Sequence, residues 1–224
     1  MALQSSWYRD AVPKLRVHAV STSLDGCIAG PSQSEAHPLG IGGEQLHEWI
    51  FATRSGRAMI GQDGGEVGTD DDFVAAGFDG IGATIMGRNM FGPIRGEWGS
   101  PAWTGWWGGD PPFHHDVFVL THHPRPSLPM AGGTTFHFVT EGAPVALERA
   151  REAAGASDIR IGGGAGTIRA FLELGLVDEM HVAVVPVLLG DGECLFERSQ
   201  WPSGYRCESY VATERAAHFR LVPR

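Results

Sequence analysis

Lysine is almost absent from this sequence, because Lys14 is the only one among 224 residues. The phosphate-binding loop of ATP- and GTP-hydrolysing proteins places a lysine after its glycines, so this scarcity excludes that kind of site. Lysine and arginine together number 17 against 26 aspartates and glutamates, which gives a formal net charge of -9. This balance argues against nucleic acid or an anionic membrane as the main partner. A locally positive pocket can still bind an anionic cofactor.

Cysteine is also scarce. Cys27, Cys194 and Cys207 are far apart and form no Cys-x-x-Cys pair, so neither a disulfide framework nor a zinc knuckle is indicated. No apolar run approaches the roughly 20 residues of a membrane span. The first residues also lack the basic-then-apolar order of a secretory signal. We therefore expect a cytoplasmic protein without a membrane partner.

The composition is that of an ordinary globular protein, with 42% hydrophobic and 19% charged residues. No linker, internal repeat or low-complexity tract divides the chain. We therefore expect a single domain over residues 1–224, with its core at about 14–222. Strand-like apolar segments alternate with helical patterns, and two strand patterns end the chain. This order predicts an α/β fold with a mostly parallel sheet covered on both faces and an antiparallel carboxyl-terminal end.

Two segments carry further local predictions. Apolar spacing predicts a helix within residues 42–55, and Thr69 followed by Asp72 predicts a capped helix start. Residues 92–116 are rich in glycine, proline and tryptophan and read as a long irregular loop. Such loops are commonly binding loops or disordered segments. Four tryptophans make disorder the less favoured interpretation, so we expect this loop to fold over something.

Three glycines, Gly162 to Gly164, end a predicted strand and precede a helical stretch at 165–174. They fail the dinucleotide fingerprint G-x-G-x-x-G, because the third glycine position is occupied by Thr167. Unpaired N–H groups at the start of a helix can nevertheless hold a pyrophosphate, and glycines allow the backbone to come close. A tight turn without a ligand is the equally favoured alternative.

Two more strand ends carry groups suited to phosphate. In "THHPR", Thr121, His122, His123 and Arg125 follow a buried strand, where α/β sheets bind ligands and where a ribose 2′-phosphate would fit. In "MGRNMF", Gly87 permits a close turn before Arg88. Three such strand ends favour one extended dinucleotide. Adjacent histidines on a strand point to opposite faces, so the clustered histidines predict no metal site.

Acid–base candidates are few. Asp25 in "SLDGCIAG" is a candidate catalytic acid, although an Asp-Gly turn is the favoured reading of that pair. His47 in "LHEWI" is a candidate proton relay, with a surface histidine as the plain alternative. The zinc-protease motif is excluded there, because no second histidine follows four residues on.

The segments "STSLDGCIAG", "IMGRNMFG", "VFVLTHHPR" and "IGGGAGTIRAFLELGLVDEMHVAVVPVLLGDGECLF" occur in this order. Together they resemble the dihydrofolate reductase-like superfamily, and within it the stand-alone proteins similar to the C-terminal reductase domain of the bifunctional riboflavin-biosynthesis deaminase–reductase. The resemblance extends from about Leu15 to Val222. It implies a three-layer α/β/α sandwich and NADPH as the hydride donor.

The resemblance also assigns positions to the cofactor. It implies that one turn lies beside the cofactor phosphates, a second loop holds the adenosine phosphate and the glycine turn holds the pyrophosphate. Backbone at two further positions is expected to flank the nicotinamide. The turn beside the phosphates consists of Met86, Gly87, Arg88 and Asn89, and the adenosine-phosphate loop of Thr121, His122 and His123, with Arg125 added. The pyrophosphate turn consists of Gly162, Gly163, Gly164, Ala165, Gly166 and Thr167. The positions beside the nicotinamide are Ala19 and Ile28.

Departures from the family separate the cofactor from the substrate. Ile161 precedes the glycines where riboflavin reductases usually carry glutamate, and no first-helix carboxylate matches that of the folate enzymes. We therefore expect an NADPH-dependent reductase for a small heteroaromatic or carbonyl/imine substrate. The alternatives are a non-catalytic NADPH-sensing module, a riboflavin-pathway reductase or a dihydrofolate reductase. Candidate substrate contacts are Trp49, Trp103, Trp106, Trp107 and His114.

The apolar strand "VAVVPVLLG" is one that this family commonly buries at a two-fold contact. The resemblance therefore implies a homodimer.

Overall fold

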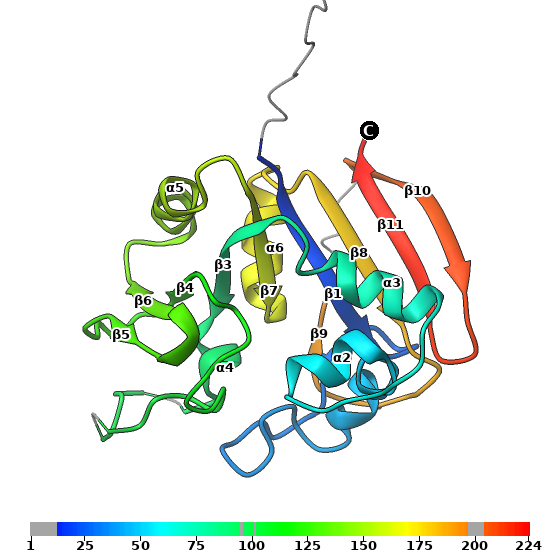
Figure 1. The fold of residues 1–224 in the computed structure, drawn as a ribbon, viewed down its shortest axis with the longest axis horizontal. Helices are drawn as coiled ribbons and strands as arrows, with labels where there is room; N and C mark the ends of the chain where they lie inside the picture. The colour runs from blue at the N-terminus through cyan, green and yellow to red at the C-terminus, as the bar shows by residue number, and fades with distance from the viewer. Residues whose placement is uncertain (1–12, 95, 101, 197–203) are drawn as a thin grey trace, which may run out of the picture.

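A large mixed β-sheet forms the centre of the structure, a computed structural model that describes residues 13–94, 96–100, 102–196 and 204–224 (Figure 1). Within these residues the sheet has nine strands in the order β10-β11-β8-β1-β7-β3-β4-β6-β5. A second, two-stranded sheet pairs β2 with β9. The strands are β1 (Leu15–Thr22), β2 (Cys27–Ala29), β3 (Ile81–Gly87), β4 (Asp116–Leu120), β5 (Leu128–Pro129), β6 (Thr135–Val139), β7 (Asp158–Gly163), β8 (Glu179–Val184), β9 (Glu193–Cys194), β10 (Tyr205–Ala212) and β11 (Ala217–Pro223).

Helices cover both faces of the large sheet (Figure 1). They are the α-helices α1 (Glu48–Ala52), α2 (Arg54–Met59), α3 (Thr69–Ala76), α4 (Arg88–Phe91), α5 (Ala143–Ala154) and α6 (Ala165–Glu173), with the 3-10 turns η1 (Gly43–His47) and η2 (Ala131–Gly133). None of the helices in the described part of the chain is long and apolar enough to cross a membrane.

The pairing of the strands confirms the predicted sandwich. β1 runs parallel to β7 and β8, β3 runs parallel to β4 and β7, and β4 runs parallel to β6. The carboxyl-terminal strands β10 and β11 are antiparallel, and β11 joins β8 in the same sense. Parallel strands carry their carboxyl ends at one edge, so the loops after β1, β3, β4, β6 and β7 meet there.

Alternating side chains place apolar residues on both faces of the sheet. On one face Ile85 and Ile161 of the sheet pack with Ile168 and Phe171 of α6, and α5 contacts β3 and β4. On the other face two clusters form. One joins Leu46 to Trp49 of α1 and Val74 of α3. The other is an aromatic cluster in which Phe91, Trp98 and Phe113 pack with Phe136 of β6.

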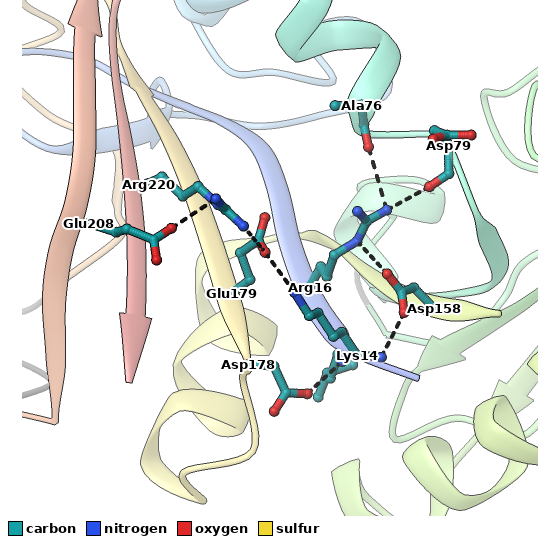
Figure 2. Close-up of polar contacts among 10 residues, drawn as sticks. Lys14, Arg16, Ala76, Asp79, Asp158, Asp178, Glu179, Glu208 and Arg220 are labelled. Atoms are coloured by element: carbon teal, nitrogen blue, oxygen red, sulfur yellow. Dashed lines mark hydrogen bonds and ion pairs between the residues drawn. The ribbon is translucent and has the colours of Figure 1, made fainter. Parts of the chain in front are cut away.

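The amino ends of β1, β7 and β8 are joined by charged side chains (Figure 2). Arg16 Nε lies 3.3 Å from the Asp158 carboxylate and Arg16 Nη2 donates to the Asp79 carbonyl at 2.8 Å. Glu179 accepts from Lys14 at 3.4 Å and from Arg220 at 2.8 Å. The single lysine therefore belongs to a structural network at the edge opposite the strand ends that were predicted to bind phosphate.

Two local expectations, for the helix within residues 42–55 and for the start of α3, need correction. The helix expected within residues 42–55 is interrupted, because Thr53 is extended and its hydroxyl accepts the Gly56 N–H at 3.0 Å to start α2. α3 begins at Thr69 itself after Gly68, and no side chain caps it. The apolar segment expected at a dimer contact, residues 182–190, begins in β8, between β11 and β1 in the sheet, and continues into the loop that follows. In that loop Leu188 is 72% exposed.

Candidate functional site

A cavity of about 710 Å³ opens at the carboxyl edge of the parallel strands. Its wall is formed by the last residues of β1, β3, β4, β6 and β7 and by the loops that follow them. These loops include all three segments whose phosphate-friendly composition was noted in the sequence. The fold therefore brings together groups separated by about eighty positions along the chain.

The glycine turn after β7 forms one wall of this cavity. Gly162 to Thr167 all line it, and α6 starts at Ala165 without a side-chain cap. The first helical bond runs from the Ile168 N–H to the Gly164 carbonyl, so the N–H groups before it have no acceptor in the preceding turn of helix. A Cβ added to Gly164 would meet no heavy atom within 4 Å. This amino end is therefore open and can accept an anion.

Two glycines pack this turn against its neighbours. A Cβ on Gly87 would lie 2.5 Å from the Thr167 hydroxyl, so the end of β3 contacts the start of α6 directly. A Cβ on Gly162 would lie 3.0 Å from the end of the Met90 side chain. A larger residue at Gly87 would therefore force the Thr167 side chain to move, so glycine allows β3 and α6 to approach closely here.

The turn after β3 and the loop after β4 supply cations. Arg88 lines the cavity and its guanidinium lies 4.0 Å from the centre of the Trp98 ring. Trp98 in turn donates its indole N–H to the His123 carbonyl at 2.8 Å. Thr121, His122 and His123 line the same region, and the Thr121 hydroxyl accepts the His123 N–H at 3.1 Å. Stacking and backbone bonds thus hold Arg88 beside the two histidines.

Charge is unevenly distributed around the cavity. Arg88 and three histidines, His47, His122 and His123, line it, whereas Glu193 is the one carboxylate among the described lining residues. Glu193 itself pairs with Arg169 at 3.5 Å. The described lining therefore combines one arginine and several imidazole groups with a single carboxylate that is already paired, a composition that can accommodate an anionic ligand in a protein of net charge -9.

Two residues expected at the cofactor lie elsewhere. Met86 is fully buried in the aromatic cluster, because its position on β3 points it to the face beneath the tryptophan-rich loop. Arg125 does not line the cavity. Its guanidinium donates to the Trp103 carbonyl and lies 5.3 Å from the Phe138 ring, and burial lowers its pKa. Arg125 therefore supports the tryptophan-rich loop.

The remaining expected cofactor residues, Asn89, Ala19 and Ile28 among them, all line the cavity. Ala19 has an unusual conformation, with φ +56, at an irregularity in the pairing of β1 with β8 between Val17 and Val20. Its N–H lies 3.2 Å from His181 Nδ1 and donates to that side chain.

The structure does not support Asp25 as a catalytic acid. Asp25 is exposed, is absent from the cavity wall and accepts the backbone N–H groups of Leu189 and Gly190 at 3.2 and 2.7 Å. The Ser23 hydroxyl and these N–H groups lower the pKa of Asp25 to about 2. An acid this strong is ionised at neutral pH, so its role is to hold the loop after β8, in line with the turn reading.

His47, the other acid–base candidate, does line the cavity. It ends η1, where the chain turns into α1, and its side chain is half-buried. Burial lowers the pKa of His47 in spite of the opposing Gly43 carbonyl and the Glu44 carboxylate. The imidazole is therefore neutral at pH 7.

Only Trp106 among the predicted substrate contacts reaches the cavity. Trp106 and Trp107 both donate their indole N–H groups to the Met90 carbonyl, at 2.5 and 2.9 Å. Trp107 packs in the aromatic cluster with Trp103. Trp49 is a buried residue of α1, and its indole N–H donates to the Ser21 hydroxyl at 2.8 Å. These three tryptophans therefore pack within the fold and do not line the cavity.

His114 is also remote from the cavity. It has φ +53, and its Nδ1 lies 2.8 Å from the Gly132 carbonyl. Within the described residues no three or more His, Cys, Asp and Glu side chains are grouped to hold a metal ion.

Several lining residues carried no signal in the sequence. Gln33, Pro38 and Leu39 reach the cavity from the loop after β2, and Thr140 and Gly142 reach it after β6. Their residue types are common in any loop. Only the order of the strands, which places β6 next to β4, could have drawn attention to the second pair.

The chain also matches known proteins. Residues 13–219 match the family model described as the RibD C-terminal domain. No curated protein matches the sequence significantly. Among solved structures, a Shewanella sp. PV-4 protein named for riboflavin biosynthesis is similar with 21% identity and a TM-score of 0.58, over 94% of this chain and 99% of that one.

Two further structures share the fold. A pyrimidine reductase-like protein from Corynebacterium diphtheriae has 15% identity and a TM-score of 0.54, over 95% of this chain and 92% of that one. The diaminohydroxyphosphoribosylaminopyrimidine deaminase/5-amino-6-(5-phosphoribosylamino)uracil reductase from Thermotoga maritima has 12% identity and a TM-score of 0.54. This chain spans 57% of that protein. At these identities the likeness concerns the fold alone.

Proposed function

This chain belongs to the RibD C-terminal domain family, and on that premise we propose that it is an NADPH-dependent reductase that transfers a hydride to a small heteroaromatic or carbonyl/imine substrate. The observation that carries the proposal is the meeting of three strand-end loops at one cavity of about 710 Å³. Each loop offers a different kind of phosphate ligand, and one dinucleotide can use all three.

The glycine turn suits the pyrophosphate. Ala165, Gly166 and Thr167 carry the free N–H groups of the first turn of α6, and the helix dipole favours negative charge there. The open space beside Gly164 allows the phosphate oxygens to approach the backbone. The residues present therefore fit this part of the cofactor.

The 2′-phosphate that distinguishes NADPH from NADH would be held by Arg88, Thr121, His122 and His123. A guanidinium offers paired donors to a phosphate, and the hydroxyl and imidazole groups add further donors. Trp98 stacks on Arg88 and bonds to His123, so it orients both sides of this group. The selectivity for NADPH follows from this cluster.

Ala19 and Ile28 then lie where the family resemblance expects the nicotinamide. A bound nicotinamide cofactor supplies the hydride, and the protein supplies orientation and a proton. His47 lies on the same cavity wall and is neutral at pH 7, so it can pass a proton between solvent and the substrate. Trp106 offers a flat apolar surface to a heteroaromatic ring.

Thermal shift measurements test the cofactor first. Saturating NADPH should raise the unfolding temperature, because a ligand that binds only the folded state stabilises it by mass action. NADH and flavin should raise it less. The absence of a shift with NADPH would remove the proposal. The loss of NADPH absorbance then tests two specific acceptors. These are dihydrofolate and 5-amino-6-(5-phosphoribosylamino)uracil, which occurs in the name of the Thermotoga protein.

A non-catalytic NADPH-binding module is the second candidate. It is favoured by the absence of an unpaired carboxylate among the described lining residues, since Glu193 is held by Arg169. This candidate predicts the same thermal shift as the reductase. It also predicts no NADPH oxidation with any acceptor, and no loss of binding when His47 is replaced by asparagine.

A further inference from the structure

Three buried histidines lie side by side behind the cavity wall, beneath α3. His18, His181 and His218 come from the neighbouring strands β1, β8 and β11 and are 4%, 1% and 0% exposed. None of the three lines the cavity. One of them, His181, nevertheless contacts the backbone of Ala19, which does line it.

A continuous chain of hydrogen bonds runs from the cavity wall to α3. The Ala19 N–H lies 3.2 Å from His181 Nδ1, His181 Nε2 lies 3.0 Å from His218 Nδ1, and His218 Nε2 lies 2.9 Å from Asp70 Oδ1. A backbone N–H can only donate, and an ionised carboxylate can only accept. The two ends therefore determine the direction of every bond between them.

This direction assigns the protons. His181 accepts from Ala19 at Nδ1 and so carries its proton at Nε2, which it donates to His218 Nδ1. His218 then carries its own proton at Nε2 and donates it to Asp70. Both imidazoles are neutral in this arrangement, and all four ring nitrogens of His181 and His218 have a hydrogen-bond partner. Two buried histidines in contact are satisfied in this one arrangement of protons.

Aromatic side chains hold the two rings in place. Phe73 stacks on His181 at 4.4 Å and on His218 at 4.3 Å, with 10° between the planes in each case. Trp49 meets His218 edge-on at 5.0 Å and donates to Ser21, another residue of the cavity wall. Burial, with His18 and His218 as neighbours, lowers the pKa of His181 to about 2, in agreement with a neutral ring.

Ala19 needs such support. A non-glycine residue with φ +56 is held against its own backbone preference, and the irregular pairing of β1 with β8 turns its N–H out of the regular ladder. His181 supplies the acceptor that the neighbouring strand does not. We infer that Asp70, His218 and His181 form a positioning chain that fixes Ala19 in the cavity wall and thereby orients the nicotinamide end of the dinucleotide. This inference rests on the proposed function, which places NADPH in the cavity.

Two nucleotides separate this role from general stability. NADPH carries the nicotinamide, whereas adenosine 2′,5′-bisphosphate retains only the adenosine end. His181→Phe removes the acceptor of the Ala19 N–H but keeps a ring for Phe73 to stack on. It should weaken NADPH binding roughly three- to tenfold, the range for one lost hydrogen bond. Binding of adenosine 2′,5′-bisphosphate should be unchanged.

Variants at the α3 end of the chain provide a second, milder test. Asp70→Ala removes the terminal acceptor and should weaken NADPH binding in the same selective way, whereas Asp70→Asn keeps an oxygen acceptor and should bind like the wild type. Asp72→Ala removes the same charge from the same helical turn at an exposed site, and should also bind like the wild type. Nitrogen NMR of ¹⁵N-histidine protein should show His181 and His218 as neutral rings protonated at Nε2, and Asp70→Ala should disturb this pattern.

Equal weakening of both nucleotides in His181→Phe and Asp70→Ala, or no weakening of either, would overturn the positioning role. A different proton arrangement in the wild-type NMR spectrum would overturn the chain itself. If the proposed function is wrong, the wild type should bind neither nucleotide, while the NMR pattern of His181 and His218 should remain. That result would also rule out the positioning of a nicotinamide by this hydrogen-bond chain.

Discussion

Replacing Gly164 with alanine separates ligand binding from folding at the start of α6. Gly164 has φ -73 and ψ -168, values that alanine adopts, and a Cβ built there meets no heavy atom within 4 Å. The added methyl group therefore displaces nothing in the protein. It occupies open space next to the N–H groups of the first helical turn, in the cavity wall.

The expected effects on stability and on binding differ in size. Alanine restricts the unfolded chain and stabilises by about 0.4–1 kcal/mol, whereas it is a poorer helix N-cap than glycine by a similar amount. The free energy of unfolding should thus change by less than about 1 kcal/mol. Each hydrogen bond from an N–H to a charged oxygen contributes about 1.5–3 kcal/mol. Loss of one such bond weakens NADPH binding roughly 10- to 150-fold.

Calorimetric titration with NADPH and urea denaturation measure the two quantities on the same protein. Gly109→Ala is the matched control, since Gly109 is exposed, lies outside the cavity wall and likewise has no atom within 4 Å of an added Cβ. An unchanged NADPH affinity in a normally stable Gly164→Ala protein would refute the assignment of this turn to the pyrophosphate.

Three further results are expected. Arg88→Ala should lower NADPH affinity about tenfold and leave NADH affinity nearly unchanged, because one charge-assisted phosphate contact is lost; equal losses in the two titrations would contradict this. Burial lowers the pKa of His18 and of His115 from 6.5 to about 4. Below pH 6.5 these two histidines bind protons in the unfolded chain but stay neutral in the folded protein. The free energy of unfolding should therefore fall as the pH is lowered from 6.5 to 4, by about 3 kcal/mol for His18 alone. A free energy of unfolding that does not change with pH in urea denaturation would disprove this. Light scattering at micromolar concentration should show a homodimer that uses the exposed segment around Leu188; a monomer would contradict it.

The alternation of strands and helices could be predicted because it depends on local patterns. Apolar strands such as β3 and β8, and the glycine turn at Gly162 to Gly164, carry their signal within a few residues. The break at Thr53 in the helix expected within residues 42–55 was not predicted, because it depends on one extended residue whose hydroxyl accepts the Gly56 N–H in the first turn of the next helix.

Whether a given side chain points into the cavity or into the core could not be predicted from these local patterns. Gly87 and Arg88 line the cavity, whereas the adjacent Met86 points into the aromatic cluster. Arg125 and Trp103 sit in motifs that suit a ligand, yet they contact each other in the support of the loop. Sequence composition describes the groups available in a loop, whereas the path of that loop depends on packing with distant segments.

The α/β fold class and the concentration of groups suited to phosphate at three strand ends could be read from the sequence, since turn and helix-start chemistry is local. The tertiary structure was needed to show that these ends share one cavity, that Asp25 lies outside it, and that hydrogen bonds connect Asp70 through His218 and His181 to Ala19 in its wall. The histidines of this hydrogen-bond chain, His181 and His218, lie singly in two separate strands and carried no signal in the sequence. The members of the chain are separated by tens to more than a hundred positions, and only the order of β11, β8 and β1 in the sheet brings them together.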